Sequence, residues 1–137
     1  TFNDYHFNVD GDGEIIYTRP LDEVPRATWH RNTGSIAIAL CCCYNARPND
    51  LGEYPPTAAQ IETLAKMFAV IAEVFDNPID REHFMTHGEA ANDDGYGLYS
   101  GDPDCRWDLE QLCDQDEIGT GGDILRGKAQ WYLENEV

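Results

Sequence analysis

Basic residues are scarce in this sequence. Of its 137 residues only 9 are Lys or Arg, against 26 Asp or Glu, which gives a formal net charge of -17 at pH 7. A field of this sign repels phosphate backbones and anionic lipid surfaces, which argues against nucleic acid and anionic membranes as partners. The same field attracts divalent cations.

Long hydrophobic runs are also missing. The longest apolar run covers residues 36–44, far short of the roughly 20 residues that cross a bilayer. No stretch resembles a signal peptide. We therefore expect no membrane insertion.

Paired cysteine motifs are absent as well. None of the five cysteines forms a C-x-x-C pair, and three are consecutive, Cys41, Cys42 and Cys43. Because side chains alternate along a strand, Cys41 and Cys43 would face one side and Cys42 the other. We predict small buried thiols here rather than disulfides or a metal cluster.

The remaining composition is that of an ordinary globular protein, with 42% hydrophobic and 26% charged residues. The length predicts one domain over residues 1–137. Two β-rich runs at 5–9 and 14–18 flank Asp10-Gly11-Asp12-Gly13, a pattern typical of a hairpin. A calcium loop is rejected there, because Arg19 takes the twelfth position, where an EF-hand needs a glutamate.

The following segments alternate between strand and helix patterns. Residues 35–44 predict a central strand buried on both faces, and residues 79–85 predict a second buried strand. Between them, Thr57 and Gln60 form a capping-box pattern that starts a helix, which Asn77-Pro78 stops. A terminal helix is expected near residues 124–133. The sequence thus predicts an α/β fold, a small mixed β-sheet flanked by helices.

Residues 86–109 combine a histidine, several carboxylates and many turn-forming residues. His87 follows an apolar pair and is expected at the mouth of a strand. Asp102 precedes Pro103, which restricts its backbone. One imidazole and one carboxylate are part of a catalytic zinc site, which needs three protein ligands. The alternative is a hydrogen-bonded histidine and a turn carboxylate that caps its neighbours.

Several motifs of the chain occur together in an ordered series: YHFNVDGDGEI, TWH followed by GSIAIAL, PPTAAQ, THGE, and GDP with RWDL, over residues 4–112. This series resembles the zinc-dependent N-acetylmuramoyl-L-alanine amidases, which include phage amidase-type lysozymes and are related to peptidoglycan-recognition proteins. The resemblance implies a zinc-dependent hydrolase of peptidoglycan that cleaves between N-acetylmuramic acid and L-alanine. It would act on the bacterial cell wall. The protein would be secreted, periplasmic or delivered by a phage as an endolysin.

The resemblance also implies roles for single residues. His87 matches the second zinc ligand of the family and Asp102 the third, while Asp108 matches a second carboxylate that is not a ligand in relatives. Tyr5 matches a tyrosine beside the metal-bound water that assists the tetrahedral intermediate. His30 matches a histidine near the substrate groove.

The first zinc ligand of the family is a histidine that would lie before Tyr5, so we expect an N-terminally incomplete domain. Two nearby histidines are poor substitutes. His6 alternates with Tyr5 along a strand and so faces away from it. His83 would share a face with His87 only on a helix.

Two further positions depart from the family pattern. The general-base glutamate of some relatives falls at Ala39, and the lysine found two residues before the third ligand is Ser100 here. Arg106 is the nearest cation that could stabilise charge in the transition state. An incomplete metal site leaves an alternative function, a non-catalytic peptidoglycan-binding module. Trp107 and Trp131 are expected in the core, with a sugar-binding groove as the alternative.

Overall fold

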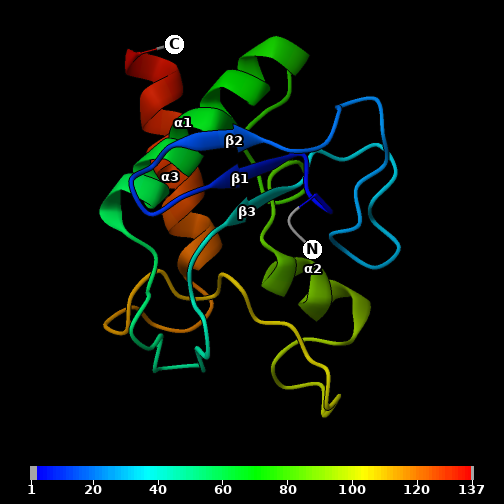
Figure 1. Ribbon diagram of the computed structural model, residues 1–137, viewed down its shortest axis with the longest axis vertical. Coiled ribbons are helices and arrows are strands. Elements are labelled where there is room, and N and C mark those ends of the chain that lie inside the picture. The colour runs from blue at the N-terminus through cyan, green and yellow to red at the C-terminus, as the bar shows by residue number, and fades with distance from the viewer. Residues whose placement is uncertain (1–2, 137) are drawn as a thin grey trace.

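The computed structural model describes residues 3–136, and within them the chain forms a three-stranded sheet and three helices. The elements are, in order, β1 (Phe7–Val9), β2 (Ile15–Tyr17), β3 (Ile38–Leu40), α1 (Ala58–Phe75), α2 (His87–Asp94) and α3 (Gly121–Asn135). The strand order is β2-β1-β3, with β1 antiparallel to β2 and parallel to β3. This mixed sheet with its helices confirms the expected α/β fold (Figure 1).

The predicted hairpin is present between β1 and β2. Its turn is closed by Asp10, whose Oδ1 accepts the N–H groups of Asp12 and Glu14 at 2.9 and 3.0 Å. Gly13 has a φ of 83°, and a Cβ at this position would lie 2.9 Å from the carbonyl oxygen of Ala59 on α1. Glycine therefore allows the hairpin to pack directly against the first turn of α1.

Helix α1 begins where the capping box predicts. Thr57 Oγ1 accepts the Gln60 N–H at 3.0 Å, and Gln60 Oε1 accepts the Thr57 N–H at 2.9 Å. The Gln60 amide is fully buried and donates to the carbonyls of Val9 and Cys41 at 3.1 and 3.0 Å. One residue thus starts the helix and joins it to the ends of β1 and β3.

The core lies between α1, α3 and the sheet. Its centre is formed by the buried side chains of Leu64, Leu112 and Leu125. Trp131 on α3 was expected in this core but is 54% exposed, whereas Trp107 is half-buried. No helix within residues 3–136 combines the length and apolar character required to span a membrane.

The strand predicted at residues 35–44 forms only over Ile38–Leu40 (β3), and it lies at the edge of the sheet and not at its centre. Only β3 is extended, it pairs with β1 alone, and its residues are half-buried, so β1 is the central strand. Before β3, the backbone of Ala37 bonds to His6, with the ring Nδ1 accepting its N–H at 3.0 Å. After β3, Cys43 adopts a φ of 63°, which ends the extended conformation.

This turn also overturns the prediction for the cysteines. Sγ of Cys42 and Sγ of Cys43 lie 3.4 Å apart, so these two side chains meet instead of facing opposite sides. Cys41 and Cys113 are exposed, and all five cysteines are free thiols. The prediction of buried thiols was wrong because strand alternation stops at Leu40.

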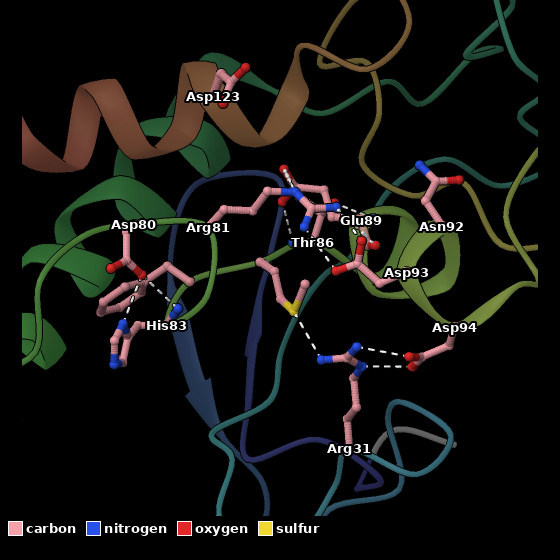
Figure 2. A network of polar contacts seen from close by, with 12 residues as sticks. Arg31, Asp80, Arg81, His83, Thr86, Glu89, Asn92, Asp93, Asp94 and Asp123 are labelled. Carbon is pink, nitrogen blue, oxygen red and sulfur yellow. Dashed lines mark hydrogen bonds and ion pairs between the residues drawn. The ribbon is translucent and has the colours of Figure 1, made fainter.

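The buried strand predicted at residues 79–85 is not formed. These residues make turns, in which Asp80 Oδ1 accepts the backbone N–H of His83 at 2.9 Å. His87 is the first residue of α2 and not the end of a strand. The reason is a second capping box, in which Thr86 Oγ1 accepts the Glu89 N–H at 3.1 Å and Glu89 Oε1 accepts the Thr86 N–H at 2.9 Å. Figure 2 shows these two side chains together at the start of the helix.

A buried ion pair attaches α2 to α3. Both guanidinium ends of Arg126 bind the Glu89 carboxylate at 2.7 Å, and Nη1 also donates to the Phe84 carbonyl at 2.8 Å. A Cβ at Gly122 would collide with the same carboxylate, so the glycine lets Glu89 approach the first turn of α3. The position of α2, and of His87 with it, depends on this pair.

We predict that Arg126→Leu lowers the free energy of unfolding by about 3–5 kcal/mol, because the buried Glu89 carboxylate is left without its partner. Denaturant unfolding followed by circular dichroism measures the change. The matched control is Lys128→Met on the same helix, whose ion pair with Glu62 is solvent-exposed and should cost at most about 1 kcal/mol. Equal losses in the two variants would contradict the anchoring role of Arg126.

Candidate active site

His87 and Asp108 form the centre of the candidate site. The His87 side chain is 17% exposed at the start of α2, and its Nδ1 lies 3.6 Å from Oδ1 of Asp108. The Asp108 carbonyl accepts the N–H of Gly88, so the backbone that follows His87 holds the backbone of Asp108. Two residues that are 21 positions apart are thereby fixed side by side.

Gly88 makes this approach possible. A Cβ on Gly88 would lie 2.8 Å from Cγ of Glu110 and 2.9 Å from the carbonyl carbon of Trp107. The contact is supported by Asn92 on α2, whose Nδ2 donates to Oε1 of Glu110 at 2.6 Å. A residue without a side chain is therefore required for the segment 107–110 to pack against α2.

The surroundings of His87 favour its neutral form. Burial lowers the pKa of the imidazole, and the positive charge of Arg106 lowers it further, while the Asp108 carboxylate opposes both by raising it. Since burial is the largest effect, the pKa is below its ordinary value of 6.5. A neutral imidazole keeps the lone pair that a metal ion needs.

Tyr5 belongs to the same group of side chains. Burial raises the pKa of its phenol, the charges of Asp108 and Asp4 raise it further, and Arg106 lowers it. The phenol therefore keeps its proton at neutral pH and can donate a hydrogen bond. An open cavity of about 1300 Å³ is lined by Tyr5, His87 and Asp108 among other residues, and Cys42 and Cys43 also border it.

Arg106 completes the group. Its charge acts on both Tyr5 and His87, and it is exposed to solvent. Of the predicted site residues, Tyr5 and His87 thus line the same cavity as Asp108, and the charge of Arg106 acts on both.

Asp102 is placed differently. It is exposed and lies in a surface turn, where its Oδ1 accepts the N–H of Asp104 at 2.8 Å and its own N–H donates to Ser100 Oγ at 3.2 Å. Within residues 3–136 no hydrogen bond or ion pair joins Asp102 to His87. Its proposed ligand role stays a prediction.

His30 also lies outside the central group. It is exposed, has a φ of 62°, and its ring packs against the indole of Trp29 with centroids 3.9 Å apart. Together with Arg31 and Asp94 these two residues line a separate hollow of about 400 Å³. The role of His30 in substrate binding stays a prediction.

The donors at the site suit zinc but do not complete a site for it. Atoms bound to one tetrahedral zinc at ordinary bond lengths lie about 3.4 Å apart, and the distance of 3.6 Å between His87 Nδ1 and Asp108 Oδ1 is close to this value. The part of the chain that the structure describes contains no group of three or more His, Cys, Asp or Glu side chains able to hold a metal ion. A catalytic zinc needs three protein ligands, so this pair alone would not complete such a site.

The other histidines near the site are engaged elsewhere. His6 is fully buried, with Nδ1 accepting the Ala37 N–H and Nε2 bonded to the Glu23 carbonyl at 2.8 Å. The His83 ring Nδ1 lies 2.7 Å from Oδ1 of Asp80.

Sequence reasoning overlooked Tyr96. Its ring centroid lies 6.2 Å from that of His87 and 5.9 Å from that of Trp29, in edge-to-face arrangements. Tyr96 stands in the turn after α2, and only the contact made by folding identifies it.

Comparison with known proteins supports the resemblance. The sequence model of the family described as N-acetylmuramoyl-L-alanine amidase matches residues 2–103. No curated protein and no solved structure matches the chain.

We predict that His87 in the metal-free protein titrates below pH 6.5. Asp108→Asn should lower its pKa further, because the neighbouring negative charge is removed, and Arg106→Gln should raise it. NMR titration of the imidazole signals measures both shifts, with Lys128→Gln as a distant control. A pKa at or above 6.5 would contradict the prediction.

The lowered pKa of His87 also makes the stability of the folded protein depend on pH. The unfolded chain takes up a proton on this histidine near pH 6.5, while the folded protein does so only at lower pH. The contribution of His87 to the free energy of unfolding should therefore fall as the pH drops below 6.5.

Proposed function

Because the chain belongs to the N-acetylmuramoyl-L-alanine amidase family, we propose that it is a zinc-dependent enzyme of peptidoglycan. Its substrate would be the amide between N-acetylmuramic acid and the first L-alanine of the stem peptide. The observation that carries the proposal is the placement of His87 beside Asp108, with Tyr5 lining the same cavity and the charge of Arg106 acting on His87.

His87 and Asp108 are the proposed zinc ligands in this chain. Their separation suits two atoms that share one ion, whereas the Asp102 carboxylate is engaged in an exposed turn. The resemblance itself matches Asp102 to the third ligand and Asp108 to a carboxylate that is not a ligand, so the choice of Asp108 rests on its distance from His87 alone.

When bound, zinc lowers the pKa of water and polarises a carbonyl, so that an amide can be attacked at neutral pH. The neutral His87 imidazole and the Asp108 carboxylate would hold the ion. Asp108 and Tyr5 line the same cavity.

Tyr5 and Arg106 would stabilise the negative charge that develops on the carbonyl oxygen. Tyr5 retains its proton, since burial and two nearby carboxylates raise its pKa. Its half-buried position lets it donate in a partly dry site, where such a bond is stronger than in water. Arg106 contributes a permanent positive charge.

A non-catalytic peptidoglycan-binding module is the second candidate. The observation that favours it is that residues 3–136 contain no group of three or more His, Cys, Asp or Glu side chains able to hold a metal ion. Both functions place the protein at the bacterial cell wall, so hydrolysis and metal content distinguish them.

We predict that Asp108→Ala abolishes zinc retention and reduces hydrolysis of purified cell wall more than about 100-fold, since even outer-shell partners of metal ligands are worth 10- to 100-fold. Elemental analysis and the release of free stem peptide, with zinc and with a chelator, measure the two effects. Asp102→Ala is the matched control and should keep both zinc and activity.

The opposite result would assign the third ligand to Asp102, as first expected from the resemblance. Absence of chelator-sensitive release by the wild-type protein would reject the amidase and leave the binding module.

We also predict that Tyr5→Phe lowers kcat by about 10²-fold with little change in KM, because the lost hydrogen bond forms only as charge develops. Steady-state kinetics on a soluble muramoyl-peptide measures this. A change confined to KM would show instead that Tyr5 binds the ground state of the substrate.

A further inference from the structure

Cys42 and Cys43 form a pair of free thiols on the turn that follows β3. The Cys42 thiol donates to Sγ of Cys43 at a distance of 3.4 Å between the two sulfur atoms. Neighbouring side chains of an extended strand point to opposite faces, and the contact exists because Cys43 leaves the extended conformation with a φ of 63°. Both residues are half-buried.

Backbone hydrogen bonds fix the turn on both sides of this pair. The Cys42 N–H donates to the Leu40 carbonyl at 2.9 Å, and the Cys43 N–H donates to the Tyr54 carbonyl at 2.6 Å. The Cys43 carbonyl in turn accepts the Ala46 N–H at 3.1 Å. The two sulfur atoms are therefore held next to each other by the fold, which favours any reaction that joins them, because the step is intramolecular.

The two thiols differ in how readily they lose a proton. The hydrogen bond from Cys42 lowers the pKa of Cys43, although burial and the Asp108 charge oppose this effect. The same hydrogen bond, together with burial, raises the pKa of Cys42. Since the thiolate is the reactive form, Cys43 is suited to attack first and Cys42 to react second.

The pair can be reached by small molecules. Both cysteines border the open cavity of about 1300 Å³ that Tyr5, His87 and Asp108 also line. The net charge of -17 and the nearby Asp108 carboxylate disfavour the approach of anionic oxidants such as glutathione disulfide. A small neutral oxidant, of which hydrogen peroxide is the simplest, meets no such repulsion.

We propose that Cys42 and Cys43 are an oxidation site at which a peroxide closes a reversible disulfide between the two neighbouring residues. The Cys43 thiolate attacks one peroxide oxygen, so that an S–O bond forms, the O–O bond breaks and hydroxide leaves. The Cys42 sulfur then attacks the Cys43 sulfur, which forms the S–S bond, breaks the S–O bond and releases a second hydroxide. The two thiol protons convert both hydroxides to water, so two thiols are oxidised and one peroxide is reduced.

The disulfide would be easily reduced again. Neighbouring Cα atoms are about 3.8 Å apart across a peptide bond, whereas the Cα atoms of ordinary disulfides are about 4.4–6.8 Å apart. Closing the ring at the shorter distance strains the bond, and strained disulfides are the labile ones. This chemistry suits a reversible modification and not a permanent cross-link.

Oxidation can be measured on the full-length wild-type protein, treated with a chelator so that no metal occupies the thiols. With one equivalent of hydrogen peroxide, the intact mass should fall by two hydrogen atoms, and dithiothreitol should restore it. Alkylation with one label before reduction and another after it, followed by peptide mass spectrometry, assigns the oxidised residues. The second label should appear on Cys42 and Cys43.

Single variants test the two roles separately. Cys42→Ser should stop at a sulfenic acid on Cys43, which dimedone traps, and Cys43→Ser should lose the reversible disulfide altogether. The matched controls are Cys41→Ser and Cys113→Ser, which remove exposed thiols and should oxidise within about twofold of the wild-type rate. Circular dichroism checks that each variant is folded.

Two results would overturn the proposal. One is a second label on any other pair of cysteines, and the other is a wild-type protein whose thiols stay reduced under conditions that oxidise free cysteine. The labelling of the wild type decides both, even where a variant does not fold. Neither measurement involves cell wall or bound zinc, so failure of this inference leaves the proposed amidase function intact.

Discussion

One buried carboxylate, that of Glu89, holds the parts of this molecule that form the candidate site. It completes the capping box with Thr86, receives both ends of the Arg126 guanidinium, and lies against Gly122 in the first turn of α3. A negative charge at the start of two helices is favoured by their dipoles, and the pair with Arg126 offsets the cost of its burial. Since His87 directly follows Thr86, these contacts also fix the position of the His87 backbone, from which the imidazole projects.

The candidate site is assembled from three distant segments around that fixed helix. Tyr5 comes from the chain before β1, His87 from the start of α2, and Arg106 with Asp108 from the loop that Gly88 allows to approach. In a chain with nearly three acidic residues for each basic one, Arg106 supplies positive charge where a carbonyl oxygen would become negative. At its last turn, the same helix holds the turn of Trp29 through Arg31 and Asp94.

Local signals allowed part of this to be predicted from the sequence. The Asp-Gly turn of the hairpin and the capping box at Thr57 each act within a few residues, and both elements formed where expected. A capping-box signal is also present in Thr86-His87-Gly88-Glu89. It was overlooked because the apolar residues before it were interpreted as a strand. Those residues instead form turns, and Phe84 among them is buried.

The sequence by itself determined the fold class and the family, because both depend on short motifs read in order. The roles that it predicts for Tyr5, His87 and Arg106 stay predictions. Only the tertiary structure decided that β3 is an edge strand, that Cys42 and Cys43 meet, and that Asp108 stands beside His87. These features depend on contacts between residues far apart in the chain, such as the approach of residues 107–110 to Gly88. No local pattern encodes such a contact, because its free energy exists only once the two segments are packed together.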